Sequence, residues 1–313
     1  MACDMEAPET VRGLACALGP GAGAGEGDGG GGLPATTACL PAIAWRAGQA
    51  RPGEEVVAEE VPVALVYNGI SHAVMLATPA DLEDFALGFS LSEGLLDSPA
   101  DLLDCEWRSH VLDGAAAGPA GEAMAACAGV TVELRITQRC FMRLKEKRRN
   151  LTGRTGCGLC GTENLSEAVR PVARRVQGLQ PDLAVIERAM AALGEAQTLQ
   201  RATGASHAAA YCSLAGDLLA LREDVGRHNA LDKLIGWLAR SGHAPAQGFI
   251  VVTSRASYEM VHKTASAGVG LLAAISAPTA LAARTAQSAG LTLLGYVRGD
   301  RATVYAGPGV APG

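Results

Sequence analysis

Patterns of apolar and polar positions divide the chain into a tail and two folded parts. Residues 1–36 hold few large apolar side chains and a glycine-rich run, so they are expected to be disordered, because little burial could offset the entropy of ordering. Residues 37–150 mix strand-like alternation with helical stretches, and residues 151–313 alternate strands with helices. The pattern predicts a mixture of strands and helices in residues 37–150 and a layered α/β domain with some parallel strands in residues 151–313.

The first of the two folded parts is expected to be rich in strands. Strands are predicted over residues 55–58, 61–67, 70–76, 102–111 and 130–136, and helices over 81–95 and 138–150. Asn68-Gly69 separates two of these strands, and this dipeptide is a strong signal for a two-residue hairpin turn.

The second part has the alternation typical of α/β proteins. Helices are predicted over residues 183–199, 227–240, 258–267 and 279–289, and strands over 206–214, 218–221, 249–253, 271–275 and 291–297. In an open α/β sheet, ligands collect at the carboxyl ends of the strands, so polar residues at these positions are candidates for a site.

Composition excludes several functional classes. The net charge of −6 argues against general nucleic-acid binding, and no run of eighteen apolar residues predicts a membrane span. Nine cysteines without a framework pattern, and no recognisable secretory signal, favour reduced thiols and a cytoplasmic location. An aromatic content of 4% predicts a core built mainly of Ala, Leu and Val.

A glycine-rich Cys-x-x-Cys segment carries the clearest chemical signal. Cys157 and Cys160 are surrounded by glycines and follow a basic run at residues 145–149. Glycine allows close backbone approach, while the Cys-x-x-Cys arrangement and nearby positive charge both lower thiol pKa values. The segment therefore favours thiol exchange or sulfur carriage.

Other interpretations of the two thiols fit less well. A structural zinc site needs two further ligands, and neither a second Cys-x-x-Cys nor paired histidines follow. A zinc deaminase needs His-x-Glu and Pro-Cys-x-x-Cys, but Gly156 precedes Cys157. A thioredoxin-like site would place the pair at the start of a helix after a strand, whereas this pair lies in a glycine-rich segment after a basic run. We therefore expect no bound metal.

Three further polar clusters lie at predicted strand or helix ends. They are the segments 203–207, 223–233 and 253–263. Structural interpretations remain open: Asp224, Ser254 and Ser257 are suitable helix caps, and His207 could be a hydrogen-bonded core histidine. Segment 223–233 is the most densely charged of the three, which favours a functional role.

Taken together, the motifs resemble the formate dehydrogenase accessory sulfurtransferases, the FdhD family. The similarity runs from about residue 39 to the C-terminus. The segments that carry it are 66–69, 78–89, 92–94, the Cys-x-x-Cys loop, 207–209, 223–230, 254–260, 276–279 and 291–305.

This resemblance implies a smaller α+β N-terminal lobe followed by a cytidine-deaminase-like α/β domain without zinc chemistry, and a homodimer. It implies that a cysteine desulfurase transfers sulfane sulfur to Cys157, with Cys160 as its partner. The sulfur would then pass to the molybdenum or tungsten of a bis(molybdopterin guanine dinucleotide) cofactor destined for formate dehydrogenase. An alternative is a non-catalytic chaperone that only binds and delivers this cofactor.

The resemblance also implies cofactor-binding residues. One family segment assigned to this role matches Tyr296, Val297, Arg298, Gly299, Asp300 and Arg301. The polar clusters are expected to add His207, Asp224, Arg227, His228, Asn229, Ser254, Arg255 and Ser257. One departure is Ala205, which stands where the family has a second glycine and would be strained if that position required a positive φ.

Overall fold

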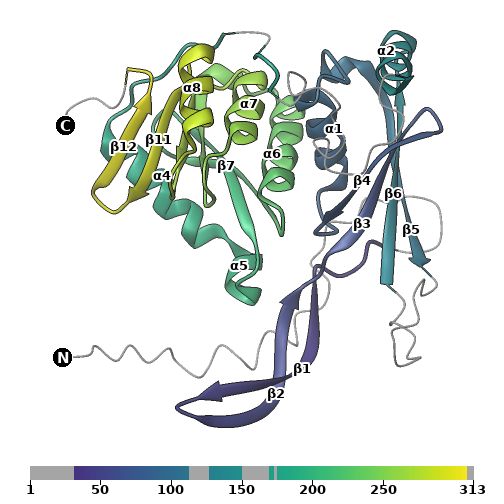
Figure 1. The fold of residues 1–313 in the computed structure, drawn as a ribbon, viewed down its shortest axis with the longest axis vertical. Helices are drawn as coiled ribbons and strands as arrows, with labels where there is room; N and C mark the ends of the chain where they lie inside the picture. Colours follow the sequence, from purple (N-terminus) through teal and green to yellow (C-terminus); the bar gives the residue numbers. More distant parts are fainter. Residues whose placement is uncertain (1–31, 113–126, 150–168, 173–174, 309–313) are drawn as a thin grey trace.

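The computed structural model describes residues 32–112, 127–149, 169–172 and 175–308. Its strands form a four-stranded sheet, a six-stranded sheet and a separate two-stranded ribbon (Figure 1). The predicted disordered tail up to residue 31, and both Cys157 and Cys160, lie outside the described residues. Within the described residues, no helix is long and apolar enough to cross a membrane.

The four-stranded sheet belongs to the N-terminal lobe and has the strand order β4-β3-β6-β5. Its strands are β3 (Val61–Tyr67), β4 (Ile70–Ala77), β5 (Leu102–Leu112) and β6 (Cys127–Ile136). The predicted hairpin between β3 and β4 is confirmed, because Asn68 and Gly69 have φ values of 46° and 80°. Alternate residues of β3 are fully buried against α1 (Leu82–Ser92), while α2 (Gln138–Arg149) follows β6.

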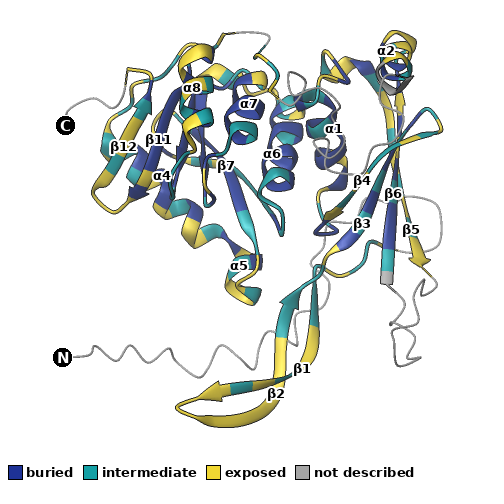
Figure 2. Ribbon diagram, viewed as in Figure 1, coloured by how far each residue is buried: buried dark blue, intermediate teal, exposed yellow. Residues whose placement is uncertain are grey.

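The two-stranded ribbon, here called the arm, consists of β1 (Thr37–Arg46) and β2 (Gln49–Ala58). Ten residue pairs join its strands without a bulge. Sequence patterns predict only the last four residues of β2 as a strand. The rest is missed because most of the arm is exposed, so burial imposes no regular alternation on it (Figure 2).

The six-stranded sheet has the order β12-β11-β10-β9-β7-β8. Its strands are β7 (His207–Ser213), β8 (Leu218–Asp224), β9 (Gly248–Val252), β10 (Leu271–Ala274), β11 (Thr292–Arg298) and β12 (Arg301–Ala306). Helices α6 (Arg227–Ser241), α7 (Tyr258–Ser266) and α8 (Ala280–Ala289) pack on one face, and α4 (Leu183–Ala196) packs on the other. This three-layer arrangement confirms the expected α/β class.

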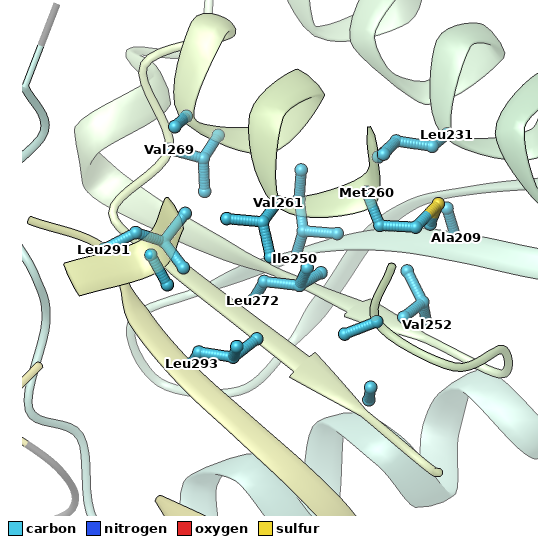
Figure 3. Close-up of a cluster of buried hydrophobic side chains, with 14 of the residues drawn as sticks. Ala209, Leu231, Ile250, Val252, Met260, Val261, Val269, Leu272, Leu291 and Leu293 are labelled. Carbon is cyan, nitrogen blue, oxygen red and sulfur yellow. The ribbon is translucent and has the colours of Figure 1, made fainter. Parts of the chain in front are cut away.

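Parallel pairing explains why the central strands are apolar throughout. Every residue of β9 and β10 is buried, because helices cover both faces of the sheet. On one face, Ile250, Val252 and Leu272 pack beneath Met260 and Val261 of α7 (Figure 3).

Two elements of the second part differ from the sequence prediction. The helix expected over 183–199 breaks at Gln197 into α4 and the short α5 (Thr198–Thr203). The carboxylate of Glu223 accepts hydrogen bonds from the N–H groups of Leu199 and Gln200, at 2.9 Å each, and so satisfies a new helix start. Strand β12 was not predicted, because its residues are mostly exposed.

Candidate functional site

The candidate residues gather along one edge of the six-stranded sheet. Strands β8, β9, β10 and β11 run in the same direction, so their carboxyl ends meet at this edge. Strands β7 and β12 run oppositely and begin there. We call this the carboxyl edge, and it comprises His207 and residues 225–228, 253–257, 275–279 and 296–301. The prediction that the polar clusters lie at strand or helix ends is confirmed.

Three helices begin at the carboxyl edge. Their N-caps are Gly226 for α6, Ser257 for α7 and Thr279 for α8. Helix N-termini carry partial positive charge and free N–H groups, and therefore attract anions. Thr279 caps its own helix by accepting from the Ala282 N–H at 3.2 Å, whereas the buried Ser257 hydroxyl has no hydrogen-bond partner among the described residues.

Charged groups from α6 and α7 meet at this edge. Nε2 of His228 lies 2.8 Å from a carboxylate oxygen of Glu259, and the partner histidine lowers the pKa of Glu259 despite its partial burial. Burial lowers the pKa of His207, and the nearby Arg227 and His228 lower it further. The buried Nε of Arg227 has no partner among the described residues. The edge thus offers unused donors to an anionic ligand.

The end of β11 and the start of β12 present an aromatic ring and two arginines beside the turn that joins them. Tyr296 has a φ of 55°, which is rare for a non-glycine residue, and its side chain is 50% exposed. Arg298 donates through Nε to the Ile275 carbonyl at 3.0 Å, and Arg301 is exposed opposite it across the turn. Gly299 has a φ of 54°, which agrees with the tight bend expected there.

Four predicted cofactor ligands are instead placed in the protein interior. Val297 is 1% exposed and packs in the core, so no side-chain contact with a ligand is available to it. Ser254 is buried and donates to the carbonyl of Arg255. Asp224 and Asn229 are buried in a network of hydrogen bonds. For these side chains burial favours the structural alternative, and their assignment to cofactor binding stays a prediction.

Asp224 joins the two lobes. Its carboxylate accepts from the N–H groups of Thr78 and Gly226 and from Asn229, and pairs with Lys233 at 2.7 Å. Asp224 and Lys233 are both fully buried. Both oxygens of this carboxylate are therefore hydrogen-bonded, and Asp224 holds the start of α6 against the N-terminal lobe.

A second buried network lies beside the first and was missed by sequence reasoning. Lys263 of α7 contacts Asp232 of α6 at 2.9 Å and Glu93 at 3.2 Å. The Ser92 hydroxyl donates to Asp232 at 2.8 Å and accepts from Lys263 at 2.9 Å. Burial acts to lower the pKa of Lys263, but the two carboxylates outweigh it and raise that pKa. The sequence signal for this network was the segment 92–94, which is one of the segments that carry the family resemblance and contains Ser92 and Glu93.

Arg170 extends this network to the first described residues after the Cys-x-x-Cys segment. Its guanidinium pairs with Glu93 at 2.7 Å. The Tyr258 hydroxyl accepts from the Arg170 N–H at 2.7 Å and donates to the Arg170 carbonyl at 2.8 Å. Because Tyr258 begins α7, these hydrogen bonds hold Arg170 beside the carboxyl edge. We use the term seam for the contacts that residues 76–78, α1, Glu93 and Arg170 make with β8, α6 and α7.

Two glycines allow the helices of the seam to approach closely. A Cβ at Gly88 of α1 would overlap the backbone carbonyl of Asp232, and one at Gly236 of α6 would overlap that of Asp84. Arg222 and Arg240 both pair with the carboxylate of Asp84, which is itself buried. The seam is therefore tightly packed as well as charged.

One group of potential metal ligands lies elsewhere in the described residues. Asp97, Asp101 and Cys140 place their ligand atoms within 4.8 Å of one another. Arg139 and Arg143 already pair with the two carboxylates at 2.8–3.1 Å. These pairs account for the acidic groups without a metal. The expectation that the protein binds no metal stays a prediction.

Fold and site together define a three-layer α/β protein with an anion-attracting edge. The chain belongs to the FdhD/NarQ family, whose family model matches residues 58–310. A protein from Cupriavidus necator named "Sulfur carrier protein FdhD" is 52% identical over 277 residues, covering 88% of this chain and 90% of that protein. A protein of the same name from Variovorax paradoxus is 51% identical, covering 88% and 93%.

A solved structure shares the fold. It is described as a putative formate dehydrogenase accessory protein from Desulfotalea psychrophila, with a TM-score of 0.63 and 22% identity. The match covers 87% of this chain and 98% of that chain. The family resemblance drawn from the motifs is confirmed.

Proposed function

We propose that this protein is a cytoplasmic sulfur carrier that delivers sulfane sulfur to a molybdenum or tungsten bis(molybdopterin guanine dinucleotide) cofactor for formate dehydrogenase. The relatives named as sulfur carriers support the general role. The carboxyl edge is the observation that supports delivery to this cofactor. Its three helix N-termini, Tyr296 and exposed arginines suit a ligand with phosphates and purines.

The residues that fit the cofactor are those with open or unpaired groups. Arg298 and Arg301 can bind phosphate bidentately, and Tyr296 can stack on a guanine. Arg227 and Ser257 keep buried donors free at the starts of α6 and α7. Arg255 is exposed on the loop between β9 and α7. Together they form a surface for the guanine dinucleotide arms.

Sulfur transfer begins at Cys157. Its thiolate attacks the outer sulfur of the desulfurase persulfide, so a new S–S bond forms on Cys157 and the desulfurase leaves as a thiolate. In delivery, this S–S bond breaks, the outer sulfur bonds to the metal, and Cys157 returns as a thiolate. The metal supplies the two electrons that reduce the sulfane sulfur to sulfide. When the sulfur is not delivered, the Cys160 thiolate attacks the inner sulfur of the Cys157 persulfide, so that a Cys157–Cys160 disulfide forms and hydrosulfide leaves.

The partners follow from these two steps. A cysteine desulfurase supplies the sulfur, and formate dehydrogenase receives the sulfurated cofactor. We propose a homodimer as the working form. The proximity of the Cys-x-x-Cys segment to the cofactor site is supported by the contacts of Arg170 with Tyr258, because Arg170 lies ten residues after Cys160 in the sequence and is held beside the carboxyl edge.

The direct test is the intact mass after incubation with a cysteine desulfurase and cysteine. The wild-type chain should gain the mass of one sulfur, and a reductant should remove it. Cys157→Ser should abolish this gain and leave formate dehydrogenase inactive, with an unchanged circular dichroism spectrum. A Cys157→Ser chain that loads sulfur normally would refute the assignment. A wild-type chain that binds the cofactor but never gains sulfur would identify a chaperone.

A further inference from the structure

A groove beside α8 lies outside the carboxyl edge. It has a volume of about 270 Å³. Residues 169–172 form one side of this groove, and Arg284, Thr285 and Ser288 of α8 form the other. We call it the basic groove. One water molecule takes about 30 Å³ in the liquid, so the basic groove has room for far more than a single small ion.

Positive charge in the basic groove is not balanced by acidic groups. Arg284 is exposed, and no ion pair within the described residues involves it. Arg170 pairs with Glu93 and its side chain is still 38% exposed. None of the 32 acidic residues of the chain lies within residues 168–181 or 260–299, and these two ranges contain both sides of the groove. A cation on a surface without acidic neighbours attracts an acidic ligand.

The basic groove runs along α8, away from the carboxyl edge. Thr279 caps α8 at that edge, and Arg284 and Ser288 lie about 8 and 14 Å further along the helix axis, at about 1.5 Å per residue. Arg175 adds a positive charge at the far end of α8, where its Nε lies 3.6 Å from the position that a Cβ on Gly290 would take. A ligand that fills the groove therefore lies below the carboxyl edge and not on it.

The walls of the basic groove combine apolar and polar groups. Val169 is 45% exposed, and Pro171 is exposed beside it. Opposite them, the Thr285 hydroxyl donates to the Leu281 carbonyl at 2.9 Å, so its oxygen can still accept a hydrogen bond. A peptide with acidic side chains suits this mixture, because its carboxylates can pair with Arg284 while its aliphatic atoms cover the apolar wall. A free inorganic anion would leave that wall in water.

The position of the basic groove favours the protein that donates sulfur as its occupant. A donor must bring its persulfide to Cys157, and Val169 and Arg170 lie only nine and ten residues after Cys160 in the sequence. The protein that receives the cofactor must instead reach the carboxyl edge, where the phosphates of the cofactor are expected. Because the two surfaces are separate, a donor in the groove leaves the cofactor site open.

We propose that the basic groove binds an acidic segment of the cysteine desulfurase while its persulfide sulfur is transferred to Cys157. This inference rests on the sulfur-carrier role in the proposed function, and it names the surface that the donor contacts. The positive charge also attracts the acidic partner over a distance, so sulfur loading is expected to be faster at low ionic strength.

The test measures initial rates of sulfur loading, by intact mass, at a fixed desulfurase concentration and increasing concentrations of the full-length carrier. Arg284→Glu reverses the charge in the groove and should raise the KM for the carrier about tenfold or more, with an unchanged maximal rate. Ser288→Glu adds a negative charge without removing an arginine, and should raise the KM less. Arg51→Glu is the control, because it reverses an exposed charge on the arm, and it should leave the KM unchanged.

Inorganic polysulfide separates docking from chemistry. The Cys157 thiolate takes one sulfane sulfur from polysulfide, so that an S–S bond forms on Cys157 and a shorter polysulfide leaves. No protein donor is needed for this reaction. Arg284→Glu should therefore load from polysulfide at the wild-type rate, which also shows that the variant is folded. Salt should raise the KM of the wild-type chain with the desulfurase more steeply than that of Arg284→Glu.

Three results would contradict this account. A wild-type KM for Arg284→Glu with the desulfurase, or slow loading of this variant from both donors, would overturn the assignment of the groove. Normal loading of Arg284→Glu by the desulfurase, followed by poor delivery to formate dehydrogenase, would also overturn it and would assign the groove to the receiving protein. A wild-type chain that gains sulfur from neither donor would overturn the sulfur-carrier function itself.

Discussion

The carboxyl edge and the seam receive residues from the same stretch of sequence but use them differently. Within residues 223–233, Arg227 and His228 face the open carboxyl edge. Asp224, Asp232 and Lys233 are fully buried in the seam. A single turn of helix thus separates groups available to a ligand from groups that hold two lobes together.

This difference shows why charge density alone does not identify a binding site. At the seam every carboxylate meets donors from another element, such as the Thr78 N–H at Asp224 and Lys263 at Asp232. At the carboxyl edge, Arg227 and Ser257 keep donors without partners among the described residues. Satisfied groups stabilise the fold, and unsatisfied ones are available to a ligand.

The largest effect is expected from breaking the seam at Asp232. Asp232→Ala leaves Lys263 buried with one of its two carboxylate partners removed, and should lower the free energy of unfolding by about 3–5 kcal/mol. Asp104→Ala is the control, because its pair with Arg135 is exposed and should contribute about 1 kcal/mol or less. Urea unfolding followed by circular dichroism measures both. Equal losses in the two variants would contradict a structural role for the seam.

Acid should weaken the seam through Glu93. Burial acts to raise the pKa of this carboxyl, but Lys263 and Arg170 outweigh it and lower the pKa to about 2 from an ordinary value of 4.5. The stabilisation is therefore complete above pH 4.5 and disappears as the pH falls to about 2, a change of about 3 kcal/mol. Glu93→Gln should lose less stability than the wild-type chain over this interval in urea titrations at stepped pH. Parallel pH profiles would argue against this ion pair.

A smaller effect on stability is expected at the carboxyl edge. Tyr296→Gly removes a side chain from a backbone with positive φ, and relief of strain offsets the added flexibility of glycine, so unfolding should change by less than about 1 kcal/mol. Affinity for GDP, which represents one arm of the cofactor, should fall because the ring is lost. Tyr296→Phe keeps the ring and should retain affinity. Calorimetry that finds all three proteins equal would exclude stacking by Tyr296.

Sequence patterns predicted those elements in which the local residue types indicate the turn or the burial of the strand. The hairpin at Asn68-Gly69 follows from local turn chemistry, and β9 and β10 follow from continuous apolar runs. The position of the polar clusters at the carboxyl edge follows from the alternation of strands and helices. Ala205 also proves unstrained, because the positive φ belongs to Gly204.

The missed features depend on contacts between distant residues. The break at Gln197 relies on the carboxylate of Glu223, and the burial of Asp224 relies on Thr78, which lies 146 residues away. The exposed β1 and β12 lack the alternation that burial imposes on a sequence. No local pattern contains this information. The assignments to Cys157 and Cys160 stay predictions, because these residues lie outside those the structure describes.

Calorimetric titration of GDP tests most directly the claim that the carboxyl edge binds the cofactor. Arg301→Glu places a negative charge where phosphate is expected and should weaken GDP binding roughly tenfold or more. Arg108→Glu makes the same change on the exposed surface of β5 and should leave affinity unchanged. Sulfur loading of Cys157 should persist in both variants. Unchanged GDP affinity in a folded Arg301→Glu chain would contradict the assignment of the carboxyl edge.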